Sequence, residues 1–147
     1  MSDDPHFRIG SSPTEHIIVR AVRREHEAAV DYWDGNWIAA KVTVAAGGFR
    51  AELVGSLRVE EFVRLRTQLR PLFDKLAGTA KFETMDHWLT VEIVGDRKGH
   101  FRAACVAVDV PTANRLTFTI DFDQTELSEI LPALDAVCEA FPVLGKP

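Results

Sequence analysis

The sequence predicts an α+β protein in which a mostly antiparallel sheet of about seven strands, curved or folded into a sandwich, packs against two helices. Several segments alternate apolar and polar residues, which is the period of a strand with one solvated face. Two longer segments instead repeat apolar residues every three or four positions, which is the period of an amphipathic helix. Most neighbouring strands are joined by connections too short for a parallel crossover, so we expect antiparallel pairing.

The length indicates one domain. The chain has 147 residues, enough for a single core without disulfides or metals to hold it, and we find no linker or internal repeat. We therefore expect a single domain over residues 1–147. Residues 1–13 contain Pro5, Gly10 and Pro13 among polar neighbours, and we expect them to form a poorly ordered lead-in.

Charge and cysteine content limit which kinds of partner and which cellular compartment suit this protein. The formal net charge is −5 and the pI is about 5.5, which disfavours direct nucleic-acid binding because that requires a basic surface. No stretch approaches the ~18 apolar residues of a membrane span, and no signal peptide is recognisable. Cys105 and Cys138 have small apolar neighbours typical of buried, reduced thiols. We expect a cytoplasmic protein with no membrane contact, whose charge suits a basic protein partner better than an acidic one.

The first half of the chain predicts three strands. His16–Val22 is expected to be a strand that continues into a charged, solvated end. Trp37–Ala45 and Phe49–Leu57 flank Ala46-Gly47-Gly48, whose composition is typical of a hairpin loop. These last two strands should therefore pair with each other.

A helix follows over Val59–Ala77. Its apolar residues recur at helical spacing, its first turn is acidic and Lys75 lies near its end, which complements the helix dipole. We expect Pro71 to bend or break it and Gly78 to serve as its C-terminal cap.

The second half predicts four more strands and a second helix. Leu116, Phe118, Ile120 and Phe122 alternate with polar residues in the last strand, so that one face of it should be core. The helix begins at about Thr125, whose hydroxyl can cap it. The four expected strands are Thr79–Thr84, Leu89–Gly95, His100–Val110 and Arg115–Phe122.

The run DYWDGNW, residues 31–37, holds the only tyrosine and two of the three tryptophans. Asp34-Gly35-Asn36 suits a tight reversal, so we expect these three residues to be exposed at the edge of the sheet, with Gly35 in a backbone conformation disfavoured for other residues. Trp33 and Trp37 flank this turn. Each is either a core residue or a half-exposed anchor of a binding surface, where tryptophan is over-represented, and we expect at least one of them to be structural.

No catalytic set is recognisable, because none of the five histidines lies near a nucleophile motif and no glycine-rich nucleotide motif is present. Asp121 and Asp123 present two carboxylates on one strand face, with Glu126 close by. Such a trio can hold Mg²⁺ or act as an acid–base pair, whereas Asp123 can equally cap the helix that follows. We expect no enzymatic activity and no cofactor. The candidate partner-binding residues are Trp33, Asp34, Asn36, Trp37, Asp121 and Asp123.

Several of these segments together resemble a family of small bacterial proteins whose best-known members are the WapI-type immunity proteins. The similarity covers most of residues 30–141, and its most specific part is the run from Asp31 to Ile38. The other segments that carry it are the Gly48-Phe49 turn, Glu61-Phe62 with Leu69 in the helix, Asn114-Arg115-Leu116, and the helix start Asp123-Gln124-Thr125-Glu126-Leu127.

The resemblance implies a cytosolic protein that binds a contact-dependent toxin whose C-terminal domain is a nuclease, and protects by binding without catalysis. We therefore expect a non-catalytic immunity protein. Two other classes stay open: a small-molecule- or metal-dependent enzyme that uses Asp121, Asp123 and Glu126, and an interaction module with a different partner.

Overall fold

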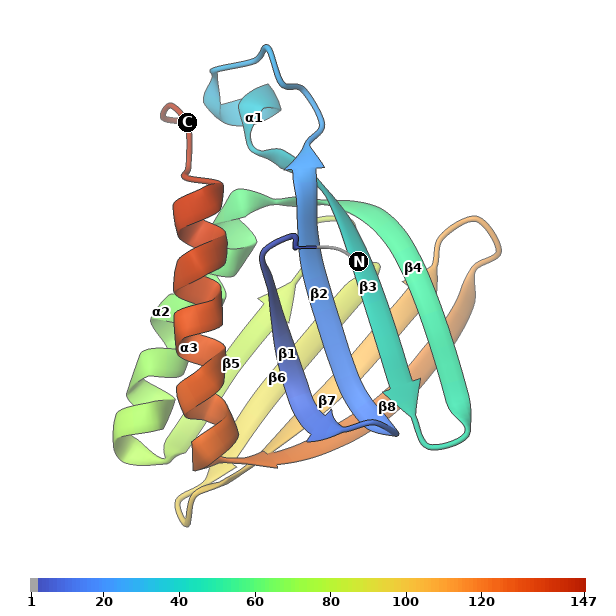
Figure 1. The fold of residues 1–147 in the computed structure, drawn as a ribbon, viewed down its shortest axis with the longest axis vertical. Helices are drawn as coiled ribbons and strands as arrows, with labels where there is room; N and C mark the ends of the chain where they lie inside the picture. The colour runs from blue at the N-terminus through green and yellow to red at the C-terminus, as the bar shows by residue number, and fades with distance from the viewer. Residues whose placement is uncertain (1–2) are drawn as a thin grey trace.

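A computed structural model describes residues 3–147, which form two antiparallel four-stranded sheets and three helices (Figure 1). This confirms the α+β prediction, with eight strands in place of about seven. The first sheet has the order β1-β2-β3-β4 and consists of β1 (His6–Ser12), β2 (Glu15–Arg24), β3 (Trp37–Ala46) and β4 (Phe49–Arg58). The second has the order β5-β6-β7-β8 and consists of β5 (Ala77–Glu83), β6 (Leu89–Asp96), β7 (His100–Asp109) and β8 (Asn114–Asp123). The helices are α1 (Tyr32–Gly35), α2 (Val59–Lys75) and α3 (Gln124–Ala140).

The two sheets lie face to face, with the strands of one crossing those of the other (Figure 1). Helix α2 lies against β5, α3 lies against β1, and the two helices contact each other, so both run along one side of the sheets. The inward side chain of every second strand residue joins the apolar faces of α2 and α3 in one core, as the alternation predicts. Among its fully buried members are Phe7, Val19, Val42, Phe62, Phe82, Val91 and Leu134.

The eighth strand is β1, and it corrects the expectation that residues 1–13 are a poorly ordered lead-in. His6–Ser12 pairs with β2, and both Phe7 and Ile9 are fully buried. Gly10 has a positive φ of 91°, and a Cβ there would lie 2.4 Å from the Glu15 carbonyl oxygen. Gly10 therefore lies at the irregularity in the β1–β2 pairing between Ile9 and Ser12, whereas Pro5 and Pro13 flank the strand. The short apolar alternation was the stronger signal.

The C-terminus of α2 and the N-terminus of α3 differ from the expectation. Helix α2 stops before residue 77: Leu76 adopts the left-handed conformation and its N–H donates to the Leu72 carbonyl, while Gly78 lies in β5. The N-cap of α3 is Asp123 and not Thr125. Pro71 is accommodated inside α2. None of the helices within residues 3–147 is long and apolar enough to cross a membrane.

Candidate functional site

The DYWDGNW run forms a single helical turn, α1, in place of the expected hairpin-like reversal. The Asp31 carboxylate accepts a hydrogen bond from the backbone N–H of Asp34 (3.1 Å), which is the usual role of aspartate at a helix start. Gly35 is buried, and its φ is not positive, so the expected special backbone is wrong. A Cβ at Gly35 would lie 3.1 Å from the Ala29 carbonyl oxygen and 3.2 Å from Leu144 Cδ1. A larger residue at this position would therefore press against the Ala29 backbone and the Leu144 side chain.

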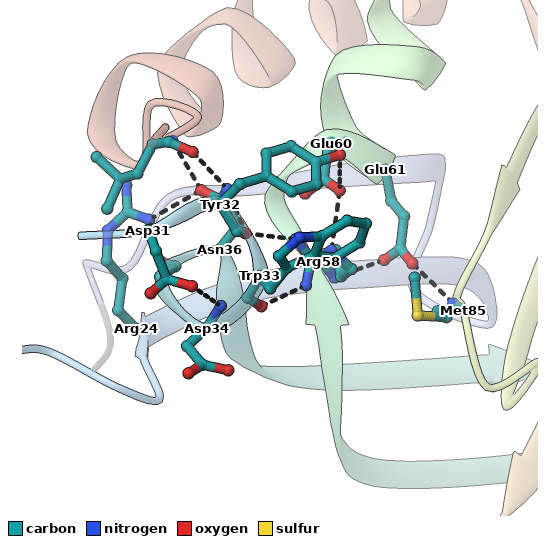
Figure 2. A network of polar contacts seen from close by, with 12 residues as sticks. Arg24, Asp31, Tyr32, Trp33, Asp34, Asn36, Arg58, Glu60, Glu61 and Met85 are labelled. Carbon is teal, nitrogen blue, oxygen red and sulfur yellow. Dashed lines mark hydrogen bonds and ion pairs between the residues drawn. The ribbon is translucent and has the colours of Figure 1, made fainter. Parts of the chain in front are cut away.

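The buried side chain of Arg58, the last residue of β4, holds α1 in place (Figure 2). A short helix leaves carbonyl groups without intrahelical partners, and Arg58 donates to two of them, the Tyr32 oxygen (2.7 Å) and the Trp33 oxygen (2.8 Å). Its Nε donates to Glu60 Oε2 at 2.8 Å. The guanidinium also lies 5.1 Å from the ring centroids of Tyr32 and Trp37, within cation–π range.

These contacts compensate the burial of a charge. Arg58 is only 2% exposed, and a buried guanidinium is tolerated when it is paired and its donors are bonded. Tyr32 Oη also donates to Glu60 (2.8 Å). This hydrogen bond is the largest cause of a raised Tyr32 pKa, and desolvation is the second. Desolvation alone would raise the Glu60 pKa, but the hydrogen bonds from Arg58 and Tyr32 lower it below its ordinary value. Glu60 is therefore ionised at neutral pH and forms an ion pair with Arg58.

The side chain of Asn36 connects α1 to the C-terminal segment. Its amide donates to the Tyr32 and Leu144 carbonyls at 2.9 Å each, and its oxygen accepts from the Leu144 N–H at 2.8 Å. Arg24 adds a bond to the Gly35 carbonyl (2.7 Å). Asn36 is fully buried, so the expectation that it is exposed with Gly35 at the sheet edge is wrong for both residues.

What remains accessible is a small surface that we call the α1 knob, residues 30–34. Trp33 is 59% exposed and Val30 is 79% exposed, and the side chains of Asp31 and Asp34 also face solvent. Trp37, by contrast, is only partly accessible and stacks under Arg58. The structure thus separates the two tryptophans: Trp37 belongs to the support, and Trp33 to the surface.

The second predicted group lies elsewhere, on β8 and at the start of α3. Asp121, Asp123 and Glu126 all line an open depression of about 880 Å³ in the second sheet. Asp121 accepts two hydrogen bonds from Arg102 (2.8 and 3.3 Å), which lower its pKa. Asp123 and Glu126 form a reciprocal cap, each carboxylate accepting the other residue's N–H at 3.0–3.1 Å.

This geometry favours the capping interpretation over an acid–base or metal site. Each of the three carboxylates already has a structural partner, and within the described residues no three His, Cys, Asp or Glu side chains gather so as to hold a metal ion. The two cysteines are unpaired thiols, and burial raises the pKa of Cys105 to about 12, so it is not a nucleophile at neutral pH.

Asp123→Ala is expected to lower the free energy of unfolding by about 1 kcal/mol, because it removes the N-cap of a seventeen-residue helix. Asp121→Ala, on the same strand face, breaks an exposed ion pair and should cost less than ~1 kcal/mol. Urea unfolding of both variants measures this. A larger loss for Asp121→Ala than for Asp123→Ala would contradict the assignment of the cap.

Sequence reasoning missed Arg58 and Glu60 as parts of this site. The predicted three-residue loop Ala46-Gly47-Gly48 would place Trp37 opposite Leu57. In the structure the turn is Gly47-Gly48 alone, which shifts the register by one residue and pairs Trp37 with Arg58. A charged residue at the end of a strand is usually solvated, so without the observed register the sequence does not single out Arg58.

Solved structures share this fold at low sequence identity. The crystal structure of WHY1 from Arabidopsis thaliana has a TM-score of 0.53 and 13% identity, covering 98% of this chain and 86% of that one. The Trypanosoma MRP1/MRP2 structure has a TM-score of 0.51 and 10% identity, covering 93% and 85%. The structure of a guide-RNA-binding protein complex bound to a guide RNA has a TM-score of 0.52 and 10% identity, covering 92% and 90%. At these identities the likeness concerns the fold alone.

The sequence comparisons point to one family. No curated protein matches the chain. A family model described as "Immunity protein WapI-like family" matches residues 8–142, a span that includes α1, its Arg58 support and all eight strands except the first two residues of β1. The chain therefore belongs to the WapI-like immunity protein family.

Proposed function

We propose that this protein is a cytoplasmic, non-catalytic immunity protein that neutralises a nuclease toxin by direct binding through the α1 knob. Family membership supports the immunity role. The observation that carries the proposed surface is that Trp33, 59% exposed, sits on a turn held by the buried Arg58 and Asn36. Tryptophan is enriched among residues that dominate binding energy, and a surface ordered before binding loses little entropy when the partner arrives.

The charge of the knob suits a basic partner. Asp31 and Asp34 flank Trp33 and are exposed, and the chain carries a net charge of −5. Nucleases bind phosphate with cationic side chains, so an acidic surface accelerates encounter with the enzyme and can cover its substrate site. We expect the chain itself not to bind RNA, although one protein of similar fold is a guide-RNA-binding complex.

Trp33→Ala is expected to weaken toxin binding by roughly 2 kcal/mol or more, about thirtyfold, because it removes the central apolar anchor of the knob. Asp34→Ala should have a smaller effect on binding and little effect on stability. The toxin to use is the C-terminal domain of a large secreted protein encoded next to this gene. Calorimetric titration gives the affinity, and nuclease assays should show inhibition at equimolar protein.

Val110→Ala is the matched control, since Val110 is 64% exposed between β7 and β8, in a different part of the structure. It should bind like wild type, and thermal melts should show all three variants folded. A Trp33→Ala variant that binds and protects cells as well as wild type would remove the α1 knob from the interface. Absence of any neighbouring toxin gene and of any toxin partner would end the immunity proposal itself.

A further inference from the structure

Strand β4 is an edge strand with one side uncovered. In the described structure it pairs with β3 alone, whereas the outer strands β5 and β1 lie against helices, and β8 contacts β1. At the end of β4 near α1, Trp88 Nε1 donates to the Ser56 carbonyl (2.8 Å) and the Ser56 hydroxyl donates to Glu25 (2.7 Å). The Trp88 ring also lies against Gly55, where a Cβ would come within 2.6 Å of it. The open part is therefore residues 49–54, which expose Phe49 (66%) and Val54 (81%). An open edge with exposed apolar side chains is a template for another strand.

The charges on β4 select one register for pairing with a second copy of itself. When two copies of the same strand pair antiparallel about a two-fold axis, the numbers of any two residues that lie opposite each other add up to the same value. That value must be even, because only then do the two opposite side chains lie on the same face of the sheet. With Ala51 opposite Ala51 of the other copy, Arg50 meets Glu52 twice and Phe49 meets Leu53 twice. Centring the axis on residue 50 or on residue 52 would instead place like charges opposite each other, which is unfavourable.

We propose that two copies of this chain pair antiparallel through β4, centred on Ala51, to form one continuous eight-stranded sheet. The contact is isologous, as in most homodimers, and uses main-chain hydrogen bonds of the open edge, two Arg50–Glu52 pairs and two Phe49–Leu53 contacts. Arg50 and Glu52 are both exposed. Within the chain Arg50 donates to the Gly47 and Phe49 carbonyls, and Glu52 lies 3.8 Å from Lys41, so the pairing with a second copy replaces or shares these solvent-exposed contacts. The α1 knob lies at the other end of β4 from the β3–β4 hairpin (Figure 1). The proposed contact is centred near that hairpin, so it leaves the knob uncovered.

Charge reversal tests this pairing. Glu52→Arg places arginines opposite one another, and Arg50→Glu places glutamates opposite one another. Each variant should dimerise roughly tenfold or more weakly than wild type in sedimentation equilibrium. An equimolar mixture of the two should form a heterodimer, because every pair is again opposite in charge. The double variant Arg50→Glu/Glu52→Arg should dimerise like wild type.

Glu92→Arg is the control, because it makes the same charge change on an exposed site of β6, a central strand. Circular dichroism and melts confirm that each variant is folded. Wild type that stays monomeric at all concentrations, or single variants that dimerise as wild type does, would overturn the proposal. A monomeric wild type whose Glu52→Arg variant loses toxin binding would instead assign the open edge to a toxin strand.

Discussion

Arg58→Met should lower the free energy of unfolding by about 3–5 kcal/mol, the range seen when one partner of a buried ion pair is removed. Methionine keeps much of the volume but donates no hydrogen bond. The Trp33 carbonyl would then lose its Arg58 donor. The Tyr32 carbonyl and the Glu60 carboxylate, which is only 15% exposed, would also lose Arg58 but keep the donors Asn36 and Tyr32 respectively. We expect the α1 knob to detach before global unfolding, since its other supports are Asn36 and Arg24.

Urea unfolding measures the loss, and tryptophan fluorescence reports the knob, because Trp33 and Trp37 both flank Arg58. Arg70→Met is the matched control: Arg70 is 56% exposed and pairs with the half-exposed Asp135, so less than ~1 kcal/mol should be lost. If Arg58→Met proves as stable as wild type, the buried guanidinium is not what holds α1.

Glu61 should make stability fall as pH rises from about 4.5 to 7. Its side chain is 3% exposed, and desolvation raises its pKa to about 7, against the opposing hydrogen bonds from the backbone N–H groups of Arg58 (2.8 Å) and Met85 (2.7 Å). Between the unfolded pKa and the folded one, the folded protein retains a proton that the unfolded chain has released. Folding is therefore favoured at the acid end of this window, and a shift of this size corresponds to about 3 kcal/mol across it.

Glu61→Gln removes the titration, so the stability difference between wild type and variant should change by about 3 kcal/mol between pH 5 and pH 8. The variant should be the less stable at pH 5 and should lose that disadvantage towards pH 8. Urea unfolding at several pH values measures both curves. Glu129→Gln, on the exposed face of α3, is the control and should follow the wild-type profile. Parallel curves for wild type and Glu61→Gln would show that Glu61 does not titrate in this window.

Local periodicity predicted most of the strands and helices, because the alternation within a strand and the three-to-four spacing of a helix depend only on residues close together in the chain. Seven strands and both long helices lie within a few residues of the predicted ranges. One error is β1, where a short apolar alternation lies among glycine and proline residues that suggest disorder. Another is the end of α2, where the cap is Leu76 in the left-handed conformation and not a residue type typical of caps. The helix α1 was predicted as a turn because Asp-Gly-Asn suits a reversal, and one helical turn has too few residues to show a period.

The sequence by itself determined the order of strands and helices, the β3–β4 hairpin and the family, because each depends on residues close together in the chain. Only the tertiary structure decided which candidate residues reach the surface. Asn36 is buried under Leu144, Trp37 lies under Arg58, and Trp33, with the same side chain, is left exposed. The exposure of a side chain is set by segments that are distant in sequence and pack over it, and no local pattern records which segments those are.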